Sequence, residues 1–183
     1  MRSYIIIQLL PDWRLPYRGH GLALGRLFVM ALLLGAVAFL GSGNVQADQV
    51  DEANIPERIA GMERVRVVSG MEAARIIDRM HQGNVATQAN FIAHYEGGGH
   101  SADYYLSLYE TPEQAVKGME DMAEVMAREG HGFSHLMKRD KDGLPFYMAL
   151  GQGQAHYFFA RGLELVWLAV DMKVAEKALM DVL

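Results

Sequence analysis

The sequence predicts an α+β domain: a single antiparallel sheet with helices packed on one face. Helix-start signals occur at several places after residue 47. Between them, apolar and polar residues alternate with a period of two, as in half-buried strands. The glycine-bearing breaks between strands are too short for crossovers, so neighbouring strands should pair antiparallel. The predicted element order is β-α-β-β-α-β, the ferredoxin-like (split βαβ) order, followed by additional C-terminal strands and a helix.

The helices are predicted from their capping residues. Ser69 and Glu72 have the spacing of a capping box. Thr111 and Gln114 form a second such box, with a proline at the first helical position. Asp171 is the expected cap of a C-terminal helix. The predicted helices begin at these caps and cover residues 69–82, 111–129 and 171 to the C-terminus.

The strands are predicted from alternation and from turn residues. The first hairpin turns at Gly97–His100, a glycine-rich loop between two alternating segments. In the opening strand, Val65 and Val67 are expected to face inward. The predicted strands are 64–68, 90–96, 103–110, 133–138, 145–150, 155–161 and 164–170.

The N-terminal segment has the features of a secretory signal. Residues 27–41 carry no charge, follow Arg26, and precede a small-x-small site that ends at Ala47. A membrane-spanning helix usually needs about 20 apolar residues, so cleavage is favoured over a retained anchor. The long basic segment before residue 27 keeps the alternative open, a signal anchor with a cytoplasmic basic end. The predicted organisation is 1–47, signal peptide or anchor; 48–58, flexible tether; 59–183, one domain.

Composition excludes several classes of function. The 183-residue chain has no cysteine, so disulfides, thiol catalysis and cysteine-ligated metals are excluded. Its net charge of -5 argues against a nucleic-acid partner. The absence of an Asn-x-Ser/Thr sequon favours a bacterial periplasm over a eukaryotic secretory route. We therefore expect an exported protein that meets the membrane only through residues 27–41, if these are retained.

Aromatic residues on the strands are the main candidate site. Alternation places aromatic or other apolar side chains on both faces of the last strands, and an uncovered face could bind a small apolar molecule or a partner protein. The opposing interpretation is that the C-terminal helix or a second copy in a homodimer covers that face. The candidate binding residues are Tyr105, Tyr109, Tyr157, Phe159 and Trp167.

A copper or zinc site is the alternative function. The chain contains 7 histidines and 12 methionines, and thioethers suit Cu(I) whereas imidazoles suit Cu(II) or zinc. Methionines 119, 122 and 126 share a helix face, which is also the spacing of a core stripe. The candidate metal ligands are His94, His100, His131 and His135.

No catalytic motif supports an enzyme. Ser101 follows His100 in the glycine-rich hairpin, but the Gly-x-Ser-x-Gly elbow is absent and the loop lacks the lysine of a phosphate-binding loop. A flexible hairpin tip is the simpler interpretation. The sequence thus predicts an exported, non-enzymatic binding domain with no cofactor.

Overall fold

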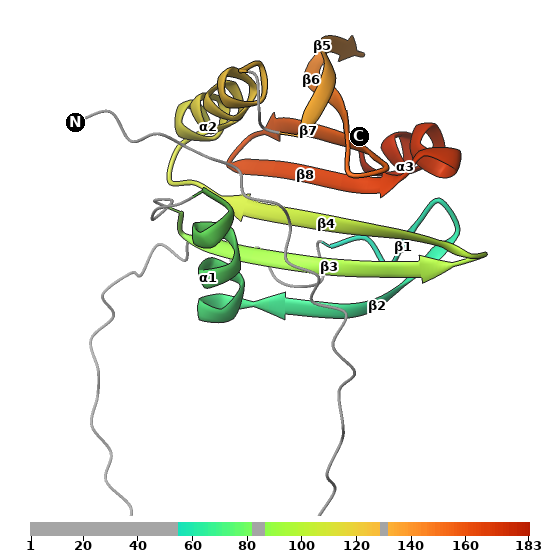
Figure 1. Cartoon of the computed structure of the whole chain (residues 1–183). Helices are drawn as coiled ribbons and strands as arrows, with labels where there is room; N and C mark the ends of the chain where they lie inside the picture. Colours follow the sequence, from blue (N-terminus) through green and yellow to red (C-terminus); the bar gives the residue numbers. More distant parts are fainter. Residues whose placement is uncertain (1–54, 82–86, 129–131) are drawn as a thin grey trace, which may run out of the picture. The chain divides into compact units, whose positions relative to one another are not determined.

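The described chain folds into eight antiparallel strands and three α-helices. The computed structural model describes residues 55–81, 87–128 and 132–183 (Figure 1). Its elements are β1 (Arg58–Ile59), β2 (Met62–Ser69), α1 (Gly70–His81), β3 (Ala89–Gly97), β4 (His100–Leu108), α2 (Pro112–Met126), β5 (Phe133–Lys141), β6 (Leu144–Gly151), β7 (Gln154–Arg161), β8 (Glu164–Asp171), a 3-10 turn (Met172–Val174) and α3 (Ala175–Val182). No helix in the described ranges is both long and apolar enough to cross a membrane.

All strands belong to one sheet, with the order β1-β2-β3-β4-β8-β7-β6-β5. Every pair of neighbours is antiparallel, which confirms the α+β class and the single antiparallel sheet. The split βαβ order is not confirmed. That order needs β4 to lie between β2 and β3, but β2 pairs directly and antiparallel with β3. The pairing of β4 with β8 therefore joins two halves of the sheet, one made of β1 to β4 and the other of β5 to β8.

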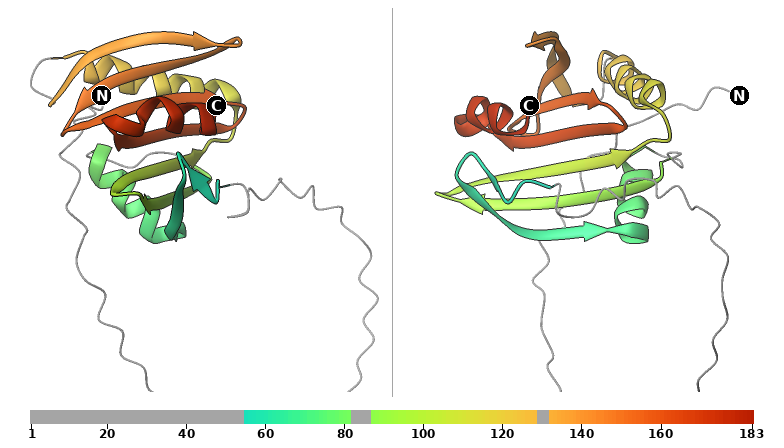
Figure 2. Two further views of the ribbon diagram at one scale, coloured as in Figure 1. Left: turned by 90° about the vertical axis from the view of Figure 1, so that its right-hand side faces the viewer. Right: turned by 180° about the vertical axis from the view of Figure 1, so that it is seen from behind.

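The helices lie on both faces of the sheet, not on one. We call the face that carries α1 and α2 the helix face; α1 packs on β2 and β3, and α2 on β5, β7 and β8. On the other face, α3 contacts β8 and β1. Figure 1 shows α1 in front of the sheet, whereas β1 lies in front when the molecule is seen from behind (Figure 2). Val166 and Leu168, on this side of the central strand β8, are fully buried, and α3 packs against that strand.

The cap predicted at Thr111 is confirmed, and the other two caps differ. Thr111 Oγ1 accepts a hydrogen bond from the Gln114 N–H at 3.3 Å, and the Gln114 amide oxygen accepts one from the Glu110 N–H. Ser69 instead ends β2, and α1 begins at a glycine with a φ of 61°. The Asp171 carboxylate accepts the Ser101 N–H at 3.1 Å, so it links two strands and does not cap α3.

The packed domain starts earlier than predicted. Ile55, inside the stretch predicted as a tether, is only 2% exposed, and Ile59 in β1 is fully buried. Tyr95 donates its hydroxyl to the Pro56 carbonyl at 2.6 Å, and the Arg64 guanidinium donates to the Ile55 carbonyl at 2.8 Å. Residues 55–59 are thus part of the fold.

The prediction that Val65 faces inward is wrong. The pairing of β2 with β3 shifts between Arg64 and Arg66, which places a bulge at Val65, and this side chain is 54% exposed. A bulge adds one residue to the strand and so breaks the alternation on which the prediction depended.

Candidate functional site

A row of apolar and aromatic side chains crosses the helix face. Cα pairing aligns Ile92 on β3 with Tyr105 on β4, Tyr105 with Trp167 on β8, and Trp167 with Phe158 on β7. The Tyr105 and Trp167 rings lie 5.8 Å apart, centroid to centroid. Helices α1 and α2 cover the two ends of this row, and the middle lies between them.

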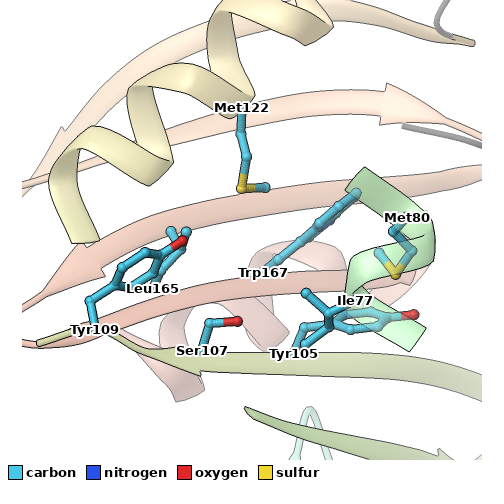
Figure 3. A pocket seen from close by; sticks show the side chains of 8 residues that line it. All are labelled: Ile77, Met80, Tyr105, Ser107, Tyr109, Met122, Leu165 and Trp167. Carbon is cyan, nitrogen blue, oxygen red and sulfur yellow. The ribbon is translucent and has the colours of Figure 1, made fainter. Parts of the chain in front are cut away.

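A small pocket opens in this gap between α1 and α2. We call it the inter-helix pocket. The space that a water-sized sphere can enter measures about 20 Å³, room for one or two water molecules. Its lining comes from α1, β4, α2 and β8 (Figure 3): Ile77, Met80, Tyr105, Ser107, Tyr109, Met122, Leu165 and Trp167.

The pocket combines apolar walls with hydroxyl groups. In Figure 3, Met122 reaches from α2 toward Trp167, and Ser107 stands between Tyr105 on β4 and Tyr109, the residue that follows this strand. Burial, with a smaller contribution from the Asp103 charge, raises the pKa of Tyr105, so this phenol is neutral. Burial and then the Asp121 charge raise the pKa of Tyr109 in the same way. Neutral hydroxyls among aromatic and thioether groups suit a ligand with an apolar body and one polar group.

A buried histidine orients the aromatic floor of the pocket. Trp167 donates its indole N–H to His156 Nδ1 at 3.2 Å, and His156 Nε2 lies 3.1 Å from the Gly151 carbonyl, to which it donates. The Phe133 ring meets the His156 ring edge-on at 5.0 Å. The imidazole is fully buried, and burial lowers its pKa to about 4 despite the opposing hydrogen bond to Gly151. A neutral imidazole therefore fixes the indole plane.

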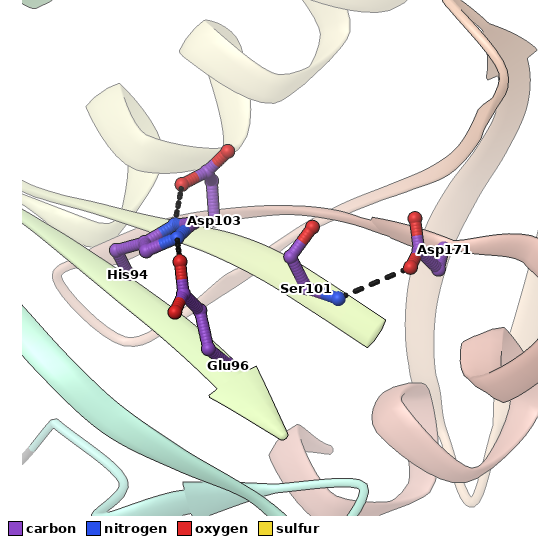
Figure 4. A network of polar contacts seen from close by, with 5 residues as sticks. All are labelled: His94, Glu96, Ser101, Asp103 and Asp171. Carbon is purple, nitrogen blue, oxygen red and sulfur yellow. Dashed lines mark hydrogen bonds and ion pairs between the residues drawn. The ribbon is translucent and has the colours of Figure 1, made fainter. Parts of the chain in front are cut away.

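A second polar group lies further along the same face. His94 Nδ1 is 2.7 Å from an Asp103 carboxylate oxygen, and Nε2 is 3.0 Å from Glu96 (Figure 4). Burial alone would lower the pKa of His94, but the hydrogen bonds and charges of the two carboxylates outweigh it and raise the pKa. With a carboxylate on each ring nitrogen, His94 is the centre of an ion-pair group when it is protonated, and both of its nitrogens are engaged.

The structure divides the predicted aromatic site between the two faces. Tyr105, Tyr109 and Trp167 line the inter-helix pocket together. Tyr157 and Phe159 alternate with Phe158, the residue that pairs with Trp167, so they lie on the opposite face, where they are 6% and 0% exposed. The predicted residues therefore do not form one surface.

The predicted metal ligands are not gathered into a centre. His94 is held by the two carboxylates, and His100 lies beside Asp171 at 3.4 Å near the hairpin turn. His135 is on β5 with its Nδ1 3.0 Å from the neighbouring Ser134 hydroxyl. His131 lies outside the described residues. In the described ranges no cluster of three or more histidine, aspartate or glutamate side chains could hold a metal ion.

Sequence reasoning missed Ser107 and the His94–Asp103 pair, although a signal for both was present. The turn of the first hairpin is Gly98-Gly99, both with positive φ, which fits a two-residue hairpin turn. That turn sets the pairing of the whole hairpin and brings His94 opposite Asp103 and Asn90 opposite Ser107. Treating the loop as four flexible residues left this register open.

Comparison of the chain with protein-family models, with curated proteins and with solved structures gives no significant match.

Proposed function

We propose that the chain is an exported, non-enzymatic binding domain whose inter-helix pocket holds a small, largely apolar ligand. The observation that carries the proposal is that residues from α1, β4 with the residue after it, α2 and β8 line one small pocket and bring to it three aromatic side chains, two thioethers and a serine hydroxyl. Ligand sites are typically concave and mainly apolar, with a few convergent polar groups that fix orientation.

The tight support behind the pocket favours a binding role. Trp167 is held through His156, and Tyr105 packs against Trp167, so the floor is ordered before a ligand arrives. A preorganised wall lowers the entropy cost of binding. The two carboxylates that act on the pocket tyrosines are both paired, Asp103 with His94 at 2.7 Å and Asp121 with Lys117. This arrangement supplies recognition rather than a free acid or base.

Trp167 is a built-in reporter of binding. The chain has two tryptophans, at positions 13 and 167, so Trp13→Phe leaves the pocket residue as the sole tryptophan, which can be excited selectively over tyrosine. We expect small linear alcohols such as propan-1-ol to shift the Trp167 emission saturably. Leu165→Phe adds bulk inside the pocket and should abolish the shift. Leu163→Phe, the same change at a 44% exposed position two residues away, should leave it intact.

The proposal fails if no compound shifts the emission, or if Leu165→Phe binds as well as the unmodified pocket. Either result would make the pocket a packing defect between two helices.

Export is the second part of the proposal and rests on residues 1–47. A phosphatase reporter active only outside the cytoplasm, fused after Leu183, should be active in a bacterial host. The intact mass of the recovered protein should correspond to a chain beginning at Asp48 if the signal is removed. An inactive reporter, with the protein found in the cytosol, would overturn this part and leave the pocket untouched.

A further inference from the structure

We propose that the ligand of the inter-helix pocket presents a primary ammonium group, as a small alkylamine does, with Ser107 as its acceptor. The inference rests on the proposed binding function and names the chemical class that the pocket selects. It is carried by a chain of hydrogen bonds that fixes the direction in which Ser107 can bond.

The chain of bonds starts at Thr87. Asn90 donates its side-chain N–H to Thr87 Oγ1 at 2.7 Å, which fixes the orientation of the amide and turns its carbonyl oxygen toward β4. Ser107 donates its hydroxyl proton to that oxygen at 2.8 Å. A carbonyl oxygen can only accept, so the single proton of Ser107 is committed. Ser107 therefore offers the pocket lone pairs and no donor, and its ligand must donate.

The charges around the pocket favour a cation as that donor. None of the eight lining side chains is basic. The Asp103 carboxylate lies close enough to act on Tyr105, and Asp103 and Glu96 together place two carboxylates around one imidazole. His94, when protonated, balances only one of these two carboxylates, and a carboxylate or phosphate ligand would find no basic side chain in the lining. An ammonium group would be attracted to the remaining negative charge.

The size of the pocket limits the group that enters. About 20 Å³ of accessible space holds one or two non-hydrogen atoms, which matches an ammonium nitrogen and its first carbon. A trimethylammonium head is too large for this space without movement of a helix. The alkyl remainder would extend along Met80 and Met122 toward the opening between α1 and α2.

A series of four-carbon compounds tests the inference on the full chain carrying Trp13→Phe. The probes are butylammonium, butan-1-ol, butanoate and butyltrimethylammonium, measured by Trp167 emission and by calorimetry. Hydrogen bonds to charged groups are stronger than neutral ones, so we expect butylammonium to bind about tenfold more tightly than butan-1-ol. Butanoate and butyltrimethylammonium should bind more weakly than the alcohol.

Variants of Ser107 assign the selectivity to its hydroxyl. Ser107→Ala should reduce the preference for butylammonium over butan-1-ol to less than about threefold, since a neutral hydrogen bond to the alcohol loses less than a charged one. Ser107→Thr keeps the hydroxyl and should restore the preference. Ser101→Ala, on the same strand and face but outside the pocket, is the matched control and should change nothing. If Ser107→Ala does not fold because Asn90 loses its partner, the relative affinities of the four compounds for the unmodified pocket test the inference by themselves.

The possible results separate this inference from the binding function. Equal affinity for butylammonium and butan-1-ol, or tighter binding of butanoate, overturns the ammonium assignment and leaves the pocket as a binding site. A preference for butylammonium that survives in folded Ser107→Ala also overturns it. If none of the four compounds binds and the neutral apolar alcohols fail as well, the proposed function itself is contradicted.

Discussion

Trp167 in the pocket floor is tied to His156 in the core by one hydrogen bond of 3.2 Å, from the indole N–H to Nδ1. The bond requires an unprotonated Nδ1, and the Gly151 carbonyl holds the remaining proton on Nε2. A second proton would have to displace the indole from a fully buried site. The state of this one imidazole therefore couples the pocket geometry to pH.

Acidification is expected to destabilise the domain through His156. Its pKa is about 4 in the folded chain and about 6.5 when unfolded, so between these values the unfolded state binds more protons. The stabilisation is fully present above pH 6.5 and is lost as the pH falls toward 4. The difference corresponds to about 3 kcal/mol in the free energy of unfolding.

Urea unfolding between pH 4 and 8 measures this dependence. His156→Gln should flatten the acid limb while lowering stability at pH 7, and His135→Gln on β5 is the control. An acid limb that keeps its slope in His156→Gln would show that other groups cause the loss.

A rise in pH is expected to reduce the stability of the domain through His94. Asp103 and Glu96 raise the pKa of His94, so its contribution is complete below pH 6.5 and declines as the pH rises through the folded value. Asp103→Asn removes one of the two charges and should cost about 1–3 kcal/mol at pH 6, with a smaller cost at pH 9. The exposed Asp142→Asn is the control. A cost for Asp103→Asn that is the same at both pH values would contradict the ion-pair description.

Elements of local structure were predictable from the sequence where the residues that determine them lie within a few positions of one another. Thr111 caps α2 because the cap and its partner Gln114 are three residues apart, and the hairpins follow from their glycine turns. The order of the strands was not predictable in this way. The pairing of β4 with β8 brings together segments about sixty residues apart, and no short-range pattern records it.

The same limit applies to the candidate site. Alternation correctly grouped Tyr105 with Tyr109, but which side of β7 shares a face with Trp167 depends on the register between β7 and β8. Pairing of Phe158 with Trp167 sends Tyr157 and Phe159 to the other face, and a shift of one residue would reverse this. Met80 and Met122 come from different helices, so their meeting at the pocket is a tertiary property.

Gly118, in the middle of α2, is expected to set the position of Tyr109. A Cβ at this residue would lie 2.7 Å from the Tyr109 hydroxyl oxygen and 3.2 Å from Leu165 Cδ2. Gly118→Ala should therefore push the Tyr109 ring into the pocket and weaken ligand binding by at least about fivefold, the loss of roughly 1 kcal/mol.

A double-mutant cycle checks this explanation. Alanine in a helix interior is favoured over glycine by about 1 kcal/mol, and this gain should appear once Tyr109→Leu has removed the obstructing ring. If Gly118→Ala stabilises the domain equally with Tyr109 present, the close approach does not constrain the pocket.

Residues 55–59 are expected to contribute to stability as core, in contrast to a tether. Ile59 is fully buried beneath α3, and Ile59→Ala should lower the free energy of unfolding by about 2–4 kcal/mol. Met180→Ala, at a 49% exposed position on α3, should change it by less than about 0.5 kcal/mol. Equal, small effects of the two substitutions would show that residues 55–59 are a linker and not part of the core.

The indole N–H resonance of Trp167 in a proton–nitrogen correlation spectrum tests the central claim most directly. This proton lies at the junction of the pocket and His156 and gives a signal distinct from the backbone. On titration with butylammonium and with butan-1-ol, we expect a saturable shift of the Trp167 signal. If the Trp167 signal stays in place at saturating concentrations of both compounds, the inter-helix pocket is not a ligand site.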